Sequence, residues 1–256
     1  MATDPKGPFG TAILLAAASL AFFLAFSWWF LDGSTTRART VRSRLTLVVE
    51  TPEGERTGSS VSQQKYSFPG GLTKAQGYGL WRDFVGEAAV VDLGPRGLLF
   101  ATLRSPDGYY TDAYNAGLAP FPREKFRGNP AAHPPTENEL AVYLDEVNRI
   151  KPIGDLPFNR LPLLARFGDP TNPDTAELVD PNDLAASFGA GVTLKRAFVQ
   201  ITDDPLTKAI GDRLPWLKSN NLAIPMSTLV PANVRGRLRY PKNDVLLHHT
   251  DFRRLP

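Results

Sequence analysis

The longest apolar run of the chain lies near its amino terminus, where no charged residue occurs from Gly7 to Leu31. A helix rises about 1.5 Å per residue, so this run can cross a hydrocarbon core of about 30 Å. A secretory signal usually has a basic start, an apolar core of about 7–15 residues and a cleavage site between small residues, and the sequence fits these features poorly. We therefore predict a retained transmembrane helix over 11–31, with a tail over 1–10 before it, in preference to a cleaved signal peptide.

Aromatic and basic residues mark the end of this run. Tryptophan and phenylalanine rings favour the headgroup level of a bilayer, and arginines close to a span favour the cytoplasmic side. The pattern predicts a basic juxtamembrane linker over 32–44 and a cytoplasmic rather than periplasmic position for the chain that follows. The predicted membrane-interface residues are Trp28, Trp29, Phe30, Arg37, Arg39, Arg42 and Arg44.

Alternating apolar and polar positions then predict two β-hairpins. Over 44–66, an alternating run leads into the turn sequence Pro-Glu-Gly at 52–54 and a second run rich in Ser, Thr and Val. Over 87–103, two apolar runs flank Gly-Pro-Arg-Gly at 94–97. Turn residues between two such runs are the usual signature of a hairpin.

The clearest helical pattern covers 136–150. Thr136 and Glu139 have the spacing of a capping box, and apolar residues follow at i, i+3, i+4 and i+7: Leu140, Tyr143, Leu144 and Val147. Weaker patterns predict strands over 161–167 and 192–202, and short helices over 181–188 and 204–217. Together these elements predict an α+β fold over 45–256, built on a mainly antiparallel, strand-rich sheet with a few short helices.

Composition and charge narrow the function classes. The 23 prolines and 21 glycines show no period and favour short strands and turns over a helical bundle. The net charge of +3 is already accounted for before residue 45, so residues 45–256 are formally neutral and give no electrostatic support for a nucleic-acid partner. The chain has no cysteine, which removes thiol nucleophiles from consideration.

Two histidines and a carboxylate near residue 250 are the only candidate metal ligands. Imidazole and carboxylate suit a transition metal, and the three residues are His248, His249 and Asp251. Adjacent histidines point in different directions, and no third histidine or cysteine is nearby. We therefore predict no metal and no cofactor.

Acidic clusters are the remaining candidates for catalysis, at Asp203 and Asp204 and around Asp180. General acid–base chemistry needs two carboxylates that face one cleft, and neighbours in sequence rarely do. Asp180 and Asp204 each precede a proline, so helix capping explains them without a substrate. We predict no catalytic residue.

A short basic ladder is the most suggestive charge pattern. Arg235, Arg237 and Arg239 alternate with other residues between two prolines, so a strand there would carry three arginines on one face. Such charge can simply protect a sheet edge from pairing. Alternatively the ladder, together with Arg253 and Arg254, contacts anionic lipid headgroups or an acidic subunit.

Three stretches resemble a family of bacterial proteins that have one N-terminal hydrophobic segment and no assigned activity. They are residues 179–217, LTLVVETPEGERTGSSV at 45–61 and GEAAVVDLG at 86–94. The resemblance implies a bacterial envelope protein, and with the apolar run it predicts an inner (cytoplasmic) membrane location. Relatives of this kind often have a more basic start, as exported proteins do, which favours the periplasmic side and opposes the arginine pattern.

Two functions from different classes follow. The first is a membrane-anchored, non-catalytic interaction protein, an accessory or assembly subunit that docks on another membrane protein complex and contacts membrane lipid. The second is a membrane-tethered hydrolase whose active site forms only in the fold. No small-molecule substrate is identified from the sequence.

Overall fold

The computed structural model describes residues 8–33, 37–70, 77, 79–104, 117–121, 136–218, 223–224 and 247–255, with the backbone alone at 8–14, 28–33, 223–224 and 247–249. The chain divides into two units. One comprises Met1–Arg39 and Tyr66–Arg82, and the other comprises Thr40–Lys65 and Asp83–Pro256.

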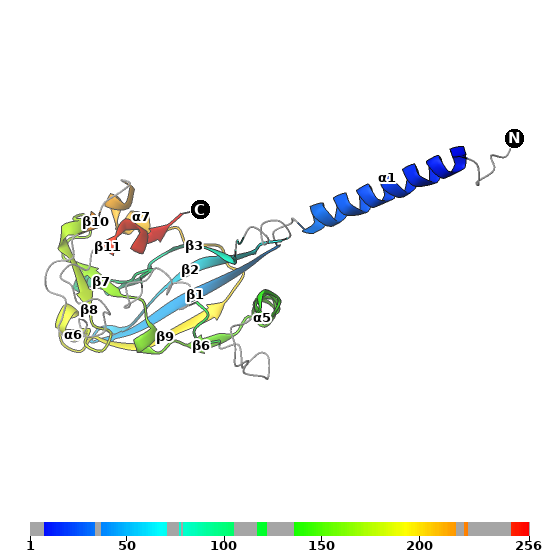
Figure 1. Cartoon of the computed structure of the whole chain (residues 1–256). Coiled ribbons are helices and arrows are strands. Elements are labelled where there is room, and N and C mark those ends of the chain that lie inside the picture. Colours follow the sequence, from blue (N-terminus) through cyan, green and yellow to red (C-terminus); the bar gives the residue numbers. More distant parts are fainter. Residues whose placement is uncertain are drawn as a thin grey trace. The chain divides into compact units, whose positions relative to one another are not determined.

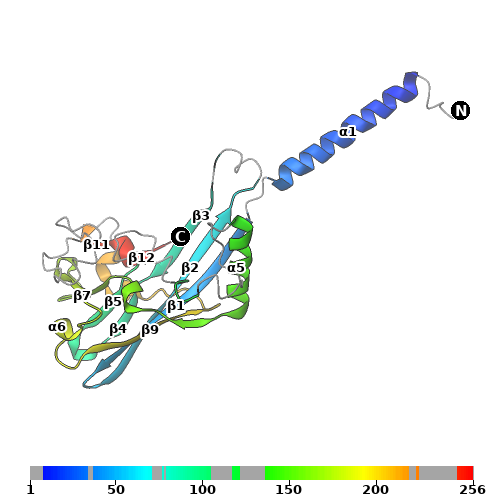
Figure 2. The same ribbon diagram turned by 60° about the horizontal axis from the view of Figure 1, so that its bottom comes forward.

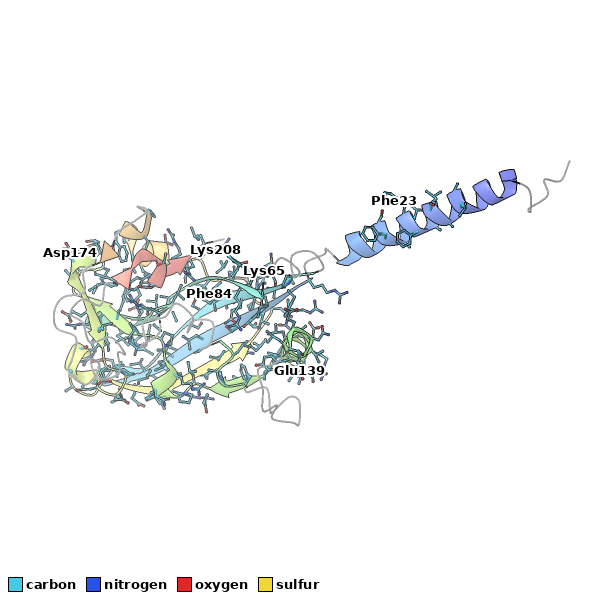
Figure 3. The ribbon with its side chains drawn as sticks, viewed as in Figure 1. Phe23, Lys65, Phe84, Glu139, Asp174 and Lys208 are labelled. Atoms are coloured by element: carbon cyan, nitrogen blue, oxygen red, sulfur yellow. The ribbon has the colours of Figure 1, made fainter. Side chains whose placement is uncertain are left out.

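Helix α1 spans Pro8–Gly33 (Figure 1). The side chains described at 15–27 are almost all exposed. Among them Phe23 projects from the helix surface in Figure 3. Ser19 donates its hydroxyl to the carbonyl of Leu15 at 2.8 Å, so the one polar side chain in the middle of this stretch is satisfied within the helix. Alanine, leucine and phenylalanine cover all sides of the described part of the helix.

A six-stranded sheet has the strand order β12-β3-β2-β1-β9-β6 (Figures 1 and 2). The pairs β1–β9, β6–β9 and β3–β12 are antiparallel. The first predicted hairpin is confirmed as β1 and β2, and β1 already begins at Arg37, inside the segment expected to be a linker. The strands are β1 Arg37–Thr51, β2 Gly54–Phe68, β3 Trp81–Glu87, β6 Ile153–Asp155, β9 Thr193–Ile201 and β12 Arg253–Arg254.

A four-stranded antiparallel sheet has the order β4-β5-β7-β8. Only Ala88 separates β3 from β4, so the chain passes directly from one sheet into the other. The second predicted hairpin is confirmed as β4 and β5, which the 3-10 helix η1 Gly94–Arg96 connects. The strands are β4 Ala89–Asp92, β5 Leu98–Ala101, β7 Leu164–Phe167 and β8 Ala176–Val179; a separate pair joins β10 Ala223–Ile224 and β11 Leu247–His248.

The two sheets approach most closely where β2 passes β4. A Cβ atom at Gly58 would lie 1.9 Å from the carbonyl oxygen of Val90 and 2.8 Å from Cα of Val91. Only glycine therefore allows this contact between the two backbones.

Helix α5 spans Glu137–Ile150 and confirms the predicted capping box. The amide of Glu139 donates to Oγ1 of Thr136, and the amide of Thr136 donates to the Glu139 carboxylate. The four predicted apolar positions of this helix are buried. Asn148 donates to the carbonyl of Thr40 at 2.8 Å, which holds α5 beside β1 (Figure 2). The other helices are α6 Ala185–Phe188, α7 Ile210–Arg213, η2 Phe158–Arg160, η3 Pro173–Thr175, η4 Pro215–Lys218 and η5 His249–Asp251.

Four aromatic rings form the centre of the main hydrophobic core. Phe100 and Phe167 come from the four-stranded sheet, Trp216 from η4 and Phe252 from the segment before β12. Their ring centroids lie 5.4–6.1 Å apart in tilted or edge-to-face pairs, the geometry that aromatic quadrupoles favour. The described domain is therefore α+β with mainly antiparallel sheets and few helices, as predicted.

Candidate functional site

The two arginines that close the predicted basic segment lie on β1 and bond to the acidic pair after β9. Arg42 donates to the carbonyls of Asp203 and Asp204 at 3.2 and 3.3 Å and to the side chain of Gln63 at 3.0 Å. Arg44 donates to the carboxylate of Asp204 at 2.5 Å. Two of the arginines predicted to lie at the membrane interface therefore bond to the acidic pair that was considered for catalysis.

The same acidic pair also reaches the end of α5. Lys151 forms an ion pair with Asp203, and its own backbone is left-handed, with φ 52°, where it caps α5. Asp204 accepts a hydrogen bond from the Thr202 hydroxyl and does not cap a helix. The cluster joins β1, the end of β9 and the end of α5, which assigns these carboxylates a positioning role within the fold.

Asp180, which was also predicted to cap a helix, has a different partner as well. Its carboxylate accepts bonds from the amide and the side chain of Asn182, and it is buried. Asp183 instead accepts the amide of Ala186 in the first turn of α6.

A small cavity lies between the two sheets and has a volume of about 30 Å³. Its lining includes Ser43, Ser60, Ser62, Thr102 and Glu87. A space of this size with hydroxyl groups around it suits one or two water molecules. Sequence analysis missed this site, although serines at alternate positions of β2 point to one face of a strand and could have indicated a polar interior.

Glu87 is the one carboxylate of the cavity lining, and it is held in place from across the fold. Its Oε2 accepts the amides of Ala209 and Ile210 at 2.7 and 3.0 Å, at the start of α7. Two backbone donors satisfy this carboxylate and fix its position. The carboxylate of Glu87 therefore caps the start of α7.

The segment with the candidate metal ligands is integrated into the core. Asp251 is fully buried and its Oδ2 lies 3.5 Å from Nη1 of Arg104. The backbone carbonyl of Asp251 accepts the amide of Leu103, and that of Phe252 accepts the amide of Ala88. Among the described residues, no group of three or more His, Asp or Glu side chains has the arrangement of a metal site.

The predicted contact arginines are only partly visible. Arg253 donates to the carbonyl of Leu217 at 2.6 Å, and Arg254 is paired with Gly86 of the neighbouring strand β3. Arg235, Arg237 and Arg239 lie outside the described residues, as do the side chains of Trp28, Trp29 and Phe30. On β1, Arg37 is exposed and Arg39 is half-buried.

The β1–β2 turn carries exposed ion pairs. Arg96 donates two hydrogen bonds to Glu53, at 2.8 and 3.0 Å, and these lower the pKa of Glu53 to about 2. The hydrogen bond from Lys195 to Glu55, helped by the charge of Glu50, raises the pKa of Lys195. These side chains are partly exposed, and the pairs connect the turn to Arg96 of η1 and Lys195 of β9.

An exposed apolar strip follows α5 into β6. Val142, Ile150 and Ile153 are 54%, 45% and 58% exposed. Among the described strands, β6 pairs with β9 and is the last strand in the order of the six-stranded sheet. We call these three residues and β6 the α5–β6 edge. Exposed apolar side chains beside an outer strand are features of protein-binding surfaces.

No family model, no curated protein and no solved structure matches the chain. The resemblance of residues 179–217 to a bacterial family therefore stays a prediction. Within the part of the chain that the structure describes, no helix is long and apolar enough to cross a membrane.

Proposed function

We propose that the chain is a membrane-anchored interaction protein, held at a bacterial inner membrane by α1, whose folded domain docks on another membrane protein complex. The uncharged stretch from Gly7 to Leu31 in the sequence supports an anchor, because a helix over these residues, at about 1.5 Å each, would exceed a hydrocarbon core of about 30 Å. The Ser19–Leu15 bond supports it too, since a hydroxyl satisfied within its helix does not need water.

The proposal places the domain on the cytoplasmic side. Arg44 pairs with Asp204, which follows 160 residues later in the chain, so this pairing forms only after Asp204 has been made. During insertion all four arginines between 37 and 44 are therefore available to the positive-inside bias. Because the chain has no cysteine, a single Gly168→Cys variant and a membrane-impermeant maleimide test the side directly. Labelling in intact spheroplasts would contradict a cytoplasmic domain.

The observation that carries docking is the α5–β6 edge. Asn148 bonds to Thr40, and only six residues lie between Gly33 at the end of α1 and Thr40. A partner of this edge is therefore expected to be a membrane protein.

Site-specific photocrosslinking in the native cells tests this surface. A photoreactive amino acid at Val142 or Ile153 is expected to capture one membrane protein, and the same group at exposed Lys208 (Figure 3) is the matched control. Val142→Asp should remove the crosslink formed from position 153, because a charge there disrupts apolar contact. Equal capture from all three positions, or from none of them, would refute docking through the α5–β6 edge.

A further inference from the structure

One end of the six-stranded sheet gathers aromatic and basic residues that the membrane anchor does not explain. Ser43 lies against Ser62, and Thr51 bonds to Gly54, so β1 and β2 run antiparallel. A Cβ at Gly86 would meet Ser62, and Arg82 lies over the ring of Tyr66. The earlier residue of β3 therefore contacts the later residue of β2, as in an antiparallel pair. The start of β1, the end of β2 and the start of β3 therefore share one end of the sheet.

This sheet end exposes an indole ring next to positive charge. Trp81 is 65% exposed. Arg82 is exposed and its guanidinium lies 5.7 Å from the centre of the Tyr66 ring. Arg37, also exposed, begins β1 two strands away. Exposure of a tryptophan ring to water is unfavourable in free energy. The headgroup region of a bilayer removes this cost, because it accommodates both the apolar ring and the polar N–H.

Chain length keeps this end close to the end of α1. Four residue steps separate Gly33 from Arg37, which limits their separation to about 14 Å. β3 is the second neighbour of β1, about 10 Å across the sheet. Trp81 can therefore lie no farther than about 25 Å from the point where α1 leaves the membrane, and the two exposed arginines favour an anionic surface there.

We propose that this sheet end is a second membrane-contact site, in which Trp81 enters the headgroup region and Arg82 and Arg37 bind anionic phospholipid. The occupant is an anionic bilayer surface, not a protein. The contact orients the domain against the membrane. This inference rests on the proposed membrane anchor.

A nitroxide at residue 79 reports on the contact in the full chain. A Cβ at Gly79 would meet no atom within 4 Å, so Gly79→Cys fits, and it is the only cysteine of the chain. The matched control is Gly168→Cys, where the nearest atom is Cβ of Thr175 at 3.6 Å. Both variants are placed in nanodiscs of phosphatidylcholine with or without phosphatidylglycerol, and collision with a water-soluble nickel chelate is measured by electron paramagnetic resonance.

The expected result is collision at 79 several-fold lower than at 168 in discs with phosphatidylglycerol, with less protection in neutral discs. Trp81→Ser should restore collision at 79 to the level at 168, and Arg82→Gln should remove the dependence on phosphatidylglycerol. Equal collision at 79 and 168 in anionic discs, or protection that survives Trp81→Ser, would overturn the inference. A chain that does not co-elute with nanodiscs at all would instead refute the anchor, so the two failures are distinguishable.

Discussion

Replacement of Gly58 by alanine tests the contact between the two sheets. The added methyl group would lie 1.9 Å from the carbonyl oxygen and 2.5 Å from the carbonyl carbon of Val90. An ordinary contact needs at least 3.4 Å, so β2 and β4 must separate by about 1.5 Å, the difference between 3.4 and 1.9 Å. The obstacle is backbone of a strand that pairs with β5 over four residues, so no side-chain rotation can relieve it.

The expected loss in the free energy of unfolding is about 3 kcal/mol or more. Overpacking in a core costs about 1–3 kcal/mol when side chains can adjust, and displaced backbone hydrogen bonds add about 1 kcal/mol each. The reduced flexibility of alanine in the unfolded chain returns only about 0.4–1 kcal/mol. Against a typical stability of about 5–15 kcal/mol this is a large fraction.

Urea denaturation of the full chain in mild detergent measures this loss through the fluorescence of Trp216, which is buried against Phe167 and becomes exposed on unfolding. Gly168→Ala is the control, because its Cβ would make an ordinary contact, and it should change stability by less than about 0.5 kcal/mol. A Gly58→Ala variant within about 1 kcal/mol of the parent would show that the sheets do not approach as described.

Two further predictions concern the core and the β1–β2 turn. Phe252→Ala removes a fully buried ring from the aromatic cluster and should lower the free energy of unfolding, measured by urea denaturation, by about 3–5 kcal/mol. Leu255→Ala, at an exposed position of the same segment, should lower it by less than about 0.5 kcal/mol. Similar losses for the two variants would mean that the segment does not pack against the core. Because the pKa of Glu53 in the folded chain is about 2, below its ordinary value of 4.5, the stabilisation from Arg96 is fully present above pH 4.5 and is lost as the pH falls through 2. Arg96→Gln should raise the Glu53 midpoint, measured by carboxyl carbon NMR, toward 4.5, and an unchanged midpoint would contradict the assigned cause.

Sequence patterns predicted the local elements because their determinants lie close together in the chain. Both hairpins have their turn residues between their own strands, and α5 has its cap at Thr136 and Glu139. The predicted helix over 204–217 is only α7 and a 3-10 turn. α7 begins where the amide of Ala209 bonds to Glu87, which lies more than 120 residues earlier in the chain. No local pattern indicates such a partner.

At the candidate site, too, residue types could be read from the sequence but long-range bonds could not. Arg42, Arg44, Asp203 and Asp204 were each identified from sequence, but the bonds between them were not, because these bonds connect β1 to residues about 160 positions away. Trp81 was not identified, since one tryptophan before a strand is not distinguishable from a core residue until its exposure is known. Pairing across the chain, not residue type, decides these roles.

The long strand β1 has a mechanical consequence. It follows α1 after three residues and pairs with β9 over eight residues from Ser43 to Glu50, with β2 on its other side. Hydrogen bonds of an antiparallel pair lie across the strand, so tension along β1 loads them together in shear instead of opening them one after another. A pull on α1 is therefore shared by both flanking strands, and β1 resists being peeled away from the attached end.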